Sequence, residues 1–296
     1  MTATGAPRAA KVHFEPLDGY RALASLLIVV AHAVLGLGLV ENLPTLDANR
    51  LSFMGVAMFF TMSGFLLYRP FIVAHLQDRP MLPVGTFLRR RLLRIFPLYY
   101  ATLFFFYVIL PRIRTPGEGY QKVLQAQAWD WAYLSNIRLA LDGWWPSGYL
   151  GHFWSLAIEE QFYLVWPVLV LLCSRRVFLF LCGGLLTISV AVRWGQWIDG
   201  DLLVRGYFTW ARLDPLVTGA ALAALARGPL GLERLRPWAR IAGIGSVAAL
   251  VYLIVSELHE RPDHVARLFV ETLFALAFGS LLVLTVTARK GGALHR

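Results

Sequence analysis

Long apolar runs separated by short polar segments dominate this chain of 296 residues. A run of about 17–25 apolar residues is long enough to cross a bilayer as a helix. Eight such runs are found, near residues 20–40, 52–74, 92–110, 152–173, 177–194, 210–227, 238–257 and 267–288. The pattern therefore predicts an all-α, polytopic integral membrane protein, with a single membrane domain over residues 1–296.

A ninth apolar segment, near residues 123–141, is shorter and is interrupted by Asp130, Asn136 and Arg138. These polar residues favour an interfacial or re-entrant helix, so we expect eight to nine transmembrane helices. If eight runs cross and the N-terminus is cytoplasmic, the inner segments hold more Lys and Arg residues than the outer ones. This is the distribution that the positive-inside rule predicts, so we expect a cytoplasmic N-terminus.

Composition strengthens the membrane assignment and excludes other classes. Hydrophobic residues make up 57% of the chain and charged residues 16%, against about 25% charged residues in soluble domains. The net charge of +10 leaves no compact basic face once the apolar runs are set aside, so we assign it to loops that face anionic lipid and expect no nucleic-acid partner. The polar N-terminal segment does not resemble a cleaved signal peptide. HERPDH (259–264) lacks the spacing of a helical zinc pair, and Cys173 and Cys182 lie in or beside apolar runs, so no metal site is expected.

The first apolar run contains two ionisable residues, which are costly in a membrane and are therefore candidates for function. Arg21 and His32 are eleven residues apart, which places them on one face of a helix, about 16 Å apart along its axis. Arg21 can reach the inner headgroups, whereas His32 must face protein or a watery cavity. An imidazole there can exchange a proton near neutral pH. A structural hydrogen bond to a neighbouring helix is an equally good interpretation.

The fourth apolar run places Ser155, Glu159 and Tyr163 on one helical face, because they are spaced by four residues. If this helix runs from outside to inside, the depth of Glu159 nearly coincides with that of His32. A carboxylate beside an imidazole orients the ring and raises its basicity, so we expect Glu159 to lie beside His32. The alternative is a structural ion pair with a buried arginine such as Arg212.

Two further groups of residues have both structural and functional interpretations. Ser63 and Gly64 fall near the middle of the second run, where small residues allow helices to pack closely and a hydroxyl can also face a substrate. Arg90, Arg91 and Arg94 begin the third run. They satisfy the positive-inside rule, and their planar guanidinium groups also suit phosphate.

The sixth run begins with two opposite charges, Arg212 and Asp214. These side chains are close enough in sequence to pair with each other. For Arg212, such a structural pair and a role in substrate binding are equally compatible with the sequence.

These elements, in this order, resemble the membrane acyltransferase-3 family of bacterial O-acyltransferases. The matching segments are LDGYRALASLLIVVAH, GVAMFFTMSGFLL, RRRLLRIFPLYY, FWSLAIEEQFYLVWP and RLDPLVTGAAL, between about residues 14 and 225. The family motifs map onto Arg21 and His32, onto Ser63, Gly64 and Phe65, onto Arg90, Arg91 and Arg94 with Pro97 and Tyr99, and onto Trp154, Ser155 and Glu159.

The resemblance implies a multi-pass protein of the bacterial cytoplasmic membrane that binds no cofactor and uses acyl-CoA, often acetyl-CoA, as a co-substrate. The acceptor it implies is a hydroxyl on a carbohydrate, a cell-envelope glycan or a natural product. The late motif of the family is not found after residue 225. We therefore expect either a shortened member or a domain that lacks its last one or two helices.

The resulting hypothesis is an O-acyltransferase in which His32, oriented by Glu159, is a general base or a transient acyl carrier, and Arg21 stabilises donor phosphate or oxyanion charge. The expected CoA-binding residues are Arg90, Arg91 and Arg94, and the expected substrate-binding residues are Ser63, Ser155, Tyr163 and Arg212. Two other classes remain open from the residues alone. They are a proton-coupled small-molecule transporter and an inactive membrane scaffold.

Overall fold

The computed structural model describes residues 15–36, 48–67, 84–114, 117–142, 150–198, 206–226, 231–258 and 266–288. These residues form helices and connecting turns, and none of them forms a β-strand. The long helices are α1 (Glu15–Gly36), α2 (Ala48–Leu67), α4 (Val84–Phe104), α9 (Phe153–Leu172), α10 (Arg175–Ile198), α12 (Asp214–Ala226), α13 (Arg236–Leu258) and α14 (Val270–Val286). The shorter ones are η2 (Phe105–Ile109), α5 (Leu110–Ile113), α6 (Glu118–Gln125), α7 (Gln127–Trp131), α8 (Ser135–Asp142), η3 (Thr209–Ala211), η4 (Glu233–Leu235) and η5 (Ala266–Phe269).

Each of the eight predicted apolar runs overlaps one of the long helices, which confirms the all-helical prediction. Five segments are long and apolar enough to cross a membrane: Leu17–Val34, Val84–Ile113, Phe153–Leu172, Arg175–Ile198 and Glu233–Ser256. The helices α2, α12 and α14 are apolar but shorter. Residues 37–40 and 68–74, at the ends of the first two predicted runs, lie outside the described residues, as does HERPDH.

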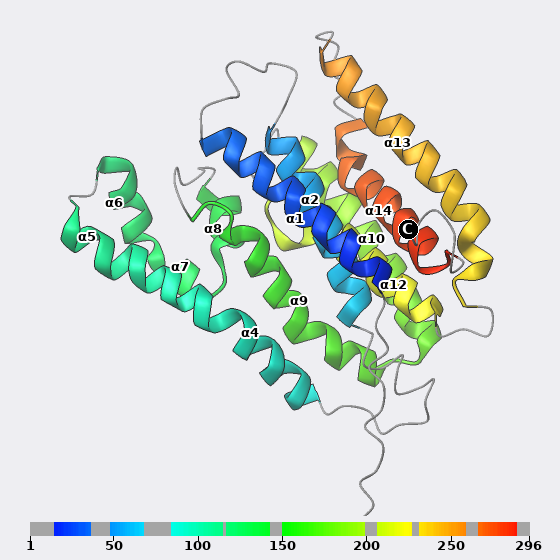
Figure 1. The fold of residues 1–296 in the computed structure, drawn as a ribbon, viewed down its shortest axis with the longest axis horizontal. Helices are drawn as coiled ribbons and strands as arrows, with labels where there is room; N and C mark the ends of the chain where they lie inside the picture. The colour runs from blue at the N-terminus through cyan, green and yellow to red at the C-terminus, as the bar shows by residue number, and fades with distance from the viewer. Residues whose placement is uncertain are drawn as a thin grey trace, which may run out of the picture.

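The ninth segment is not one helix. Within 123–141 the chain forms the end of α6, then α7 and α8, with turns between them. Tyr133 has a φ of 56°, a left-handed conformation that a continuing α-helix excludes. In Figure 1 these short helices gather at one end of the bundle, beside α4 and the start of α9.

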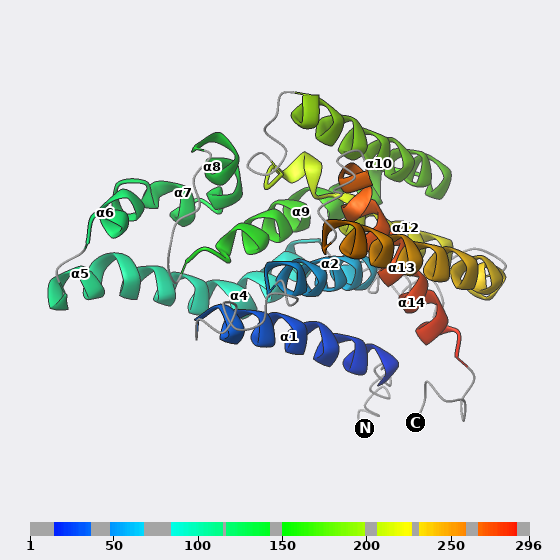
Figure 2. The same cartoon turned by 90° about the horizontal axis from the view of Figure 1, so that it is seen from above.

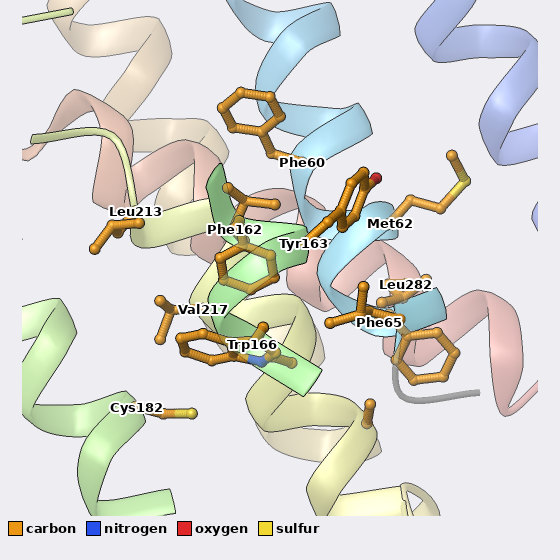
Figure 3. Packing of buried hydrophobic residues seen from close by; sticks show 14 of the residues in the cluster. Phe60, Met62, Phe65, Phe162, Tyr163, Trp166, Cys182, Leu213, Val217 and Leu282 are labelled. Atoms are coloured by element: carbon orange, nitrogen blue, oxygen red, sulfur yellow. The ribbon is translucent and has the colours of Figure 1, made fainter. Parts of the chain in front are cut away.

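The main core lies between α2, α9, α10, α12 and α14, with α1 on one side of the bundle and α10 on the other (Figure 2). Figure 3 shows Phe162 and Trp166 of α9 facing Val217 of α12 and Cys182 of α10. The rings of Phe162 and Trp166 stack with their centroids 4.3 Å apart. The side chains that face away from this core are also apolar, among them Leu26, Leu98, Leu164, Phe180 and Ile244. Such an extensive exposed apolar surface is that of a protein surrounded by lipid.

The helices α2 and α12 cross backbone to backbone. A Cβ added at Gly64 would lie 2.0 Å from the Leu216 carbonyl oxygen, and one added at Gly219 would lie 2.0 Å from the Thr61 carbonyl oxygen. No side chain fits at either position, so the glycines allow the close approach that small residues provide in membrane bundles. The packing interpretation of Gly64 is therefore confirmed.

A buried ion pair joins α10 to the start of α12. The Arg193 guanidinium donates to both carboxylate oxygens of Asp214, at 2.9 and 3.0 Å. It also donates to the Leu268 and Ala211 carbonyl oxygens and to the Thr272 hydroxyl, at 2.7 to 2.8 Å. A charge this deep is tolerated only when its partners satisfy it so completely. The pair therefore fixes how α10, α12 and the start of α14 meet.

Candidate active site

His32 lies in the last turns of α1, and its ring is exposed. Its Nδ1 atom is 2.8 Å from the Ile28 carbonyl oxygen one turn earlier. Because a carbonyl oxygen only accepts, Nδ1 carries the proton in this contact, and Nε2 of a neutral ring keeps a free lone pair. The ring is thus bonded to its own helix, and one nitrogen remains available for chemistry.

The ring of His32 meets a second histidine, which immediately precedes α9. The centroids of His32 and His152 are 5.8 Å apart, and the rings cross at 83°. The Phe153 ring packs edge-on against His152, 4.9 Å away. His152 was not among the site residues predicted from the sequence. A histidine next to Trp154 at the predicted outer end of a span was a usable signal.

Glu159 lies among hydroxyl groups. One of its carboxylate oxygens, Oε1, accepts hydrogen bonds from the Ser63 hydroxyl of α2 and from the Tyr163 hydroxyl one turn further along α9. Figure 3 shows the Tyr163 hydroxyl directed toward α2. The structure therefore brings Ser63, Glu159 and Tyr163 into one cluster, which we call the carboxylate cluster.

The predicted contact between Glu159 and His32 is absent from the described residues. His32 meets His152 instead, seven residues before Glu159, which corresponds to about 10 Å along α9. The predicted contact was wrong because the starting depth of each helix was taken from the edge of its apolar run, and His32 lies closer to the end of α1 than that edge implied. The carboxylate cluster and the pair formed by His32 and His152, which we call the histidine pair, are therefore two separate sites along α9.

The predicted arginine cluster is divided by its helix faces. The Arg91 guanidinium carbon lies 4.0 Å from the centroid of the Tyr163 ring, so Arg91 faces the carboxylate cluster. Arg90 and Arg94, spaced by four residues, are exposed, and neither forms an ion pair within the described parts of the chain. Guanidinium groups without such partners suit a phosphorylated ligand.

Arg21 lies near the start of α1, on the unbroken helix that carries His32. Its Nη1 atom is 3.6 Å from a carboxylate oxygen of Asp18, and both side chains are about half exposed. An exposed pair of this kind contributes little to stability. Arg21 is therefore accessible, and it lies about 16 Å from His32 along the helix axis, as its spacing predicts.

Ser155 has a local role in the structure. Its hydroxyl donates to the His152 carbonyl oxygen at 3.0 Å, and its backbone N–H donates to the same oxygen at 3.3 Å. These bonds shape the first turn of α9. Ser155 is thus placed to hold the backbone of His152, whereas its predicted role in substrate binding remains a proposal.

The expected pair between Arg212 and Asp214 does not form. The Arg212 guanidinium binds a carboxylate oxygen of Glu271, and Asp214 binds Arg193. Arg212 also faces the rings of Phe53, Trp154 and Tyr207, with its guanidinium carbon 4.7 to 5.5 Å from their centroids. Arg212 follows the 3-10 turn η3, whereas Asp214 is the first residue of α12. A charge inside the apolar run, Arg193, was the sequence signal for the correct partner.

The short helices contain a second buried acid, Asp130, which in the sequence only interrupts an apolar segment. The Tyr107 hydroxyl donates to the Asp130 carboxylate, and the Tyr99 hydroxyl donates to the Asp130 carbonyl oxygen at 2.6 Å. Burial raises the pKa of Asp130, although Tyr107 and Arg138 act in the opposite direction. A π-helical turn, Phe105–Ile109, carries Tyr107. Together these bonds tie α4 to α7 beside the start of α9.

Known proteins resemble this chain over most of its length. A family model described as an acyltransferase domain matches residues 15–293. The peptidoglycan O-acetyltransferase OatA of Listeria monocytogenes is 27% identical over 230 residues, which cover 73% of this chain and 34% of that protein. The putative peptidoglycan O-acetyltransferase YrhL of Bacillus subtilis is 29% identical over 221 residues, covering 70% and 32%.

A third relative, the O-acetyltransferase OatA of Staphylococcus aureus, is 30% identical over 175 residues, which cover 54% of this chain and 25% of that protein. The chain thus matches about a third or less of the length of these relatives. No solved structure matches it. The family model nevertheless covers nearly all of the sequence and includes His32, Glu159 and the arginine cluster. The chain belongs to the acyltransferase-3 family, as its motifs predicted.

Proposed function

We propose that this protein is a membrane O-acyltransferase that moves an acyl group, with acetyl as the first candidate, from cytoplasmic acyl-CoA to a hydroxyl of a carbohydrate acceptor. Family membership and relatives named for peptidoglycan O-acetylation support the reaction class. The observation that carries the proposal is the hydrogen bonding of the His32 ring. Its Nδ1 is engaged by Ile28, which leaves Nε2 open at the exposed end of α1.

In this proposal the donor lies along α1 and α9. Arg90, Arg91 and Arg94 bind the CoA phosphates, and Arg21, at the start of α1, stabilises donor phosphate charge. Eleven residues separate Arg21 from His32, which is about 16 Å along a helix. An extended pantetheine arm has about the same length. Phosphates held at the arginines therefore leave the thioester near His32.

The chemical step follows from this placement. Nε2 of His32 removes the proton from the acceptor hydroxyl while the acceptor oxygen bonds to the thioester carbonyl carbon. The carbon–sulfur bond then breaks and CoA leaves. Of the two roles predicted for His32, we favour the general base, because the Nδ1 hydrogen bond fixes the ring with Nε2 as its free acceptor.

The carboxylate cluster supports the donor in this scheme. Glu159 fixes the Tyr163 hydroxyl, and the face of the Tyr163 ring carries the Arg91 guanidinium. Glu159 is thus a positioning residue for the donor site and no longer the partner of His32. We further propose eight spans in the bacterial cytoplasmic membrane, with the N-terminus and the arginine cluster on the cytoplasmic side.

Labelled acetyl-CoA tests the proposal. The protein, reconstituted in lipid nanodiscs, is incubated with radiolabelled acetyl-CoA and soluble peptidoglycan fragments, and acetylated product is measured. Replacing His32→Ala should reduce turnover by about 10²–10⁴-fold, the usual contribution of a general base, without changing the Tm. Full activity of this variant would remove His32 from the mechanism. Proton-driven uptake of the fragments without acetyl-CoA consumption would favour a transporter.

A further inference from the structure

We propose that His152 is a second catalytic residue, which passes the acceptor proton from His32 to the departing CoA thiolate. This inference rests on the proposed acyl transfer and adds a residue to it. The starting observation is the edge-to-face contact of the two imidazole rings, with centroids 5.8 Å apart, one on α1 and the other immediately before α9. At that separation one water molecule, or a small rotation of either ring, connects their nitrogens.

The surrounding residues hold His152 in place. Ser155 binds its carbonyl oxygen, and Phe153 packs edge-on against its ring. The Phe153 ring stacks in turn on Tyr99, with centroids 4.8 Å apart, and the Tyr99 hydroxyl is bonded to the Asp130 carbonyl oxygen. The aromatic residues beside α9 therefore form a rigid support beneath the ring. A group used for proton transfer needs this kind of orientation.

Electrostatics keep the pair from holding two protons. Burial, and after it the charge of His32, lowers the pKa of His152. The N-terminal end of α9 is also the positive end of the helix dipole, which disfavours an imidazolium there. Among the described residues, His32 is the one charged group that shifts the pKa of His152, and these residues contain no group of three His, Cys, Asp or Glu side chains that could hold a metal ion. The surroundings therefore suit the movement of a single proton between the two rings.

The step balances without any further reactant. The acceptor hydroxyl loses its proton to Nε2 of His32 as the new carbon–oxygen bond forms. As the carbon–sulfur bond breaks, the electron pair stays on sulfur and the proton reaches it through His152. Both rings are neutral again at the end, ready for the next acceptor. A lone His32 would have to release its proton to solvent or directly to the thiolate.

The test replaces His152→Phe, which keeps an aromatic ring against Phe153 but cannot carry a proton. With acetyl-CoA we expect kcat to fall about 100-fold and KM for acetyl-CoA to change less than about twofold. With the acetyl thioester of 4-nitrothiophenol, whose thiolate leaves without a proton, the same variant should lose only about threefold in kcat/KM relative to wild type. A merely structural role would lower both reactions equally, which would overturn the proposal. His75→Phe, at a histidine outside the described residues, is the matched control.

A second measurement does not depend on turnover. The pKa of His152 is followed by nuclear magnetic resonance of ¹⁵N-labelled histidine, in the wild type and in His32→Phe. Loss of the His32 charge should raise the pKa of His152, yet leave it below about 6.5, because burial is the larger cause of its depression. An unchanged pKa of His152 in His32→Phe would refute the electrostatic coupling between the two rings. If the wild-type protein shows this coupling but transfers no acyl group, the proposed function is refuted instead.

Discussion

The carboxylate cluster and the histidine pair, the two sites along α9, differ in how their polar groups are hydrogen-bonded. At the carboxylate cluster, a single oxygen of Glu159 receives two hydroxyl donors, and Arg91 lies against the ring of one of them. At the histidine pair, about 10 Å away, the His32 ring is exposed and keeps one nitrogen free. An oxygen that already accepts two hydrogen bonds is a weaker base, whereas a reacting base needs an open lone pair. In the proposed mechanism, the carboxylate cluster positions the donor and the histidine pair carries out the proton transfers.

The largest effect is expected when the hydrogen-bond-accepting carboxylate of the carboxylate cluster is removed. Glu159→Ala leaves the Ser63 and Tyr163 hydroxyls without their partner, which costs about 1–3 kcal/mol for buried polar groups. We expect a lower Tm in detergent, together with weaker binding of acetyl-CoA, seen as a higher KM. Glu159→Gln retains an acceptor oxygen and should recover most of the Tm. The contrast fails if Glu159→Ala leaves the Tm unchanged and only abolishes turnover, as expected for His32→Ala.

A smaller effect is expected at the donor arginines. Lys cannot reproduce the planar contact of Arg91 with the Tyr163 ring or bind phosphate with two parallel bonds. Arg91→Lys should therefore raise KM for acetyl-CoA about tenfold, roughly 1.4 kcal/mol, with kcat nearly unchanged. Arg89→Lys, at the exposed neighbouring arginine, is the control and should change KM less than about twofold. An equal rise in KM for both variants would mean that CoA binding depends only on the overall positive charge of this segment and not on Arg91 in particular.

The smallest effect is expected at Ser155. Removing its hydroxyl deletes one hydrogen bond to the His152 carbonyl oxygen, worth about 0.5–1.5 kcal/mol. Ser155→Ala should lower kcat a few-fold, and Ser155→Thr, which keeps the hydroxyl, should restore it. If Ser155→Ala instead raises KM for the carbohydrate acceptor at constant kcat, then Ser155 binds substrate, as its sequence motif first suggested.

The sequence was sufficient for the helices and for the identity of several site residues, because hydropathy and intramembrane charge are strong local signals. It failed where the answer depended on how helices are placed against one another. Hydropathy locates Glu159 and His32 in depth only to within a few residues, and that uncertainty decided whether they meet. The partner of Asp214 likewise depended on the direction of each side chain, which sequence spacing does not determine.

Some surprises had a signal that could have been used. Arg193 is a charge inside an apolar run, and His152 is a histidine at the edge of another. Both fit the rule by which Arg21 and His32 were selected. In contrast, nothing in the sequence indicates the π-helical turn that carries Tyr107 toward Asp130, because an extra residue in a helical turn depends on tertiary contacts.

The glycine crossing of α2 and α12 has a consequence for natural variation in this protein. Gly219 contacts Thr61 and Phe65 across the crossing, and Ser63 lies between these two residues on α2. Any larger residue at Gly219 would push α2 away from α12, and the Ser63 hydroxyl would move relative to Glu159. A substitution at Gly219 touches no proposed substrate and no reactive group, yet its phenotype should resemble that of a change in the donor site. Surveys of inactive alleles should therefore count this distant glycine among the positions that set the geometry of catalysis.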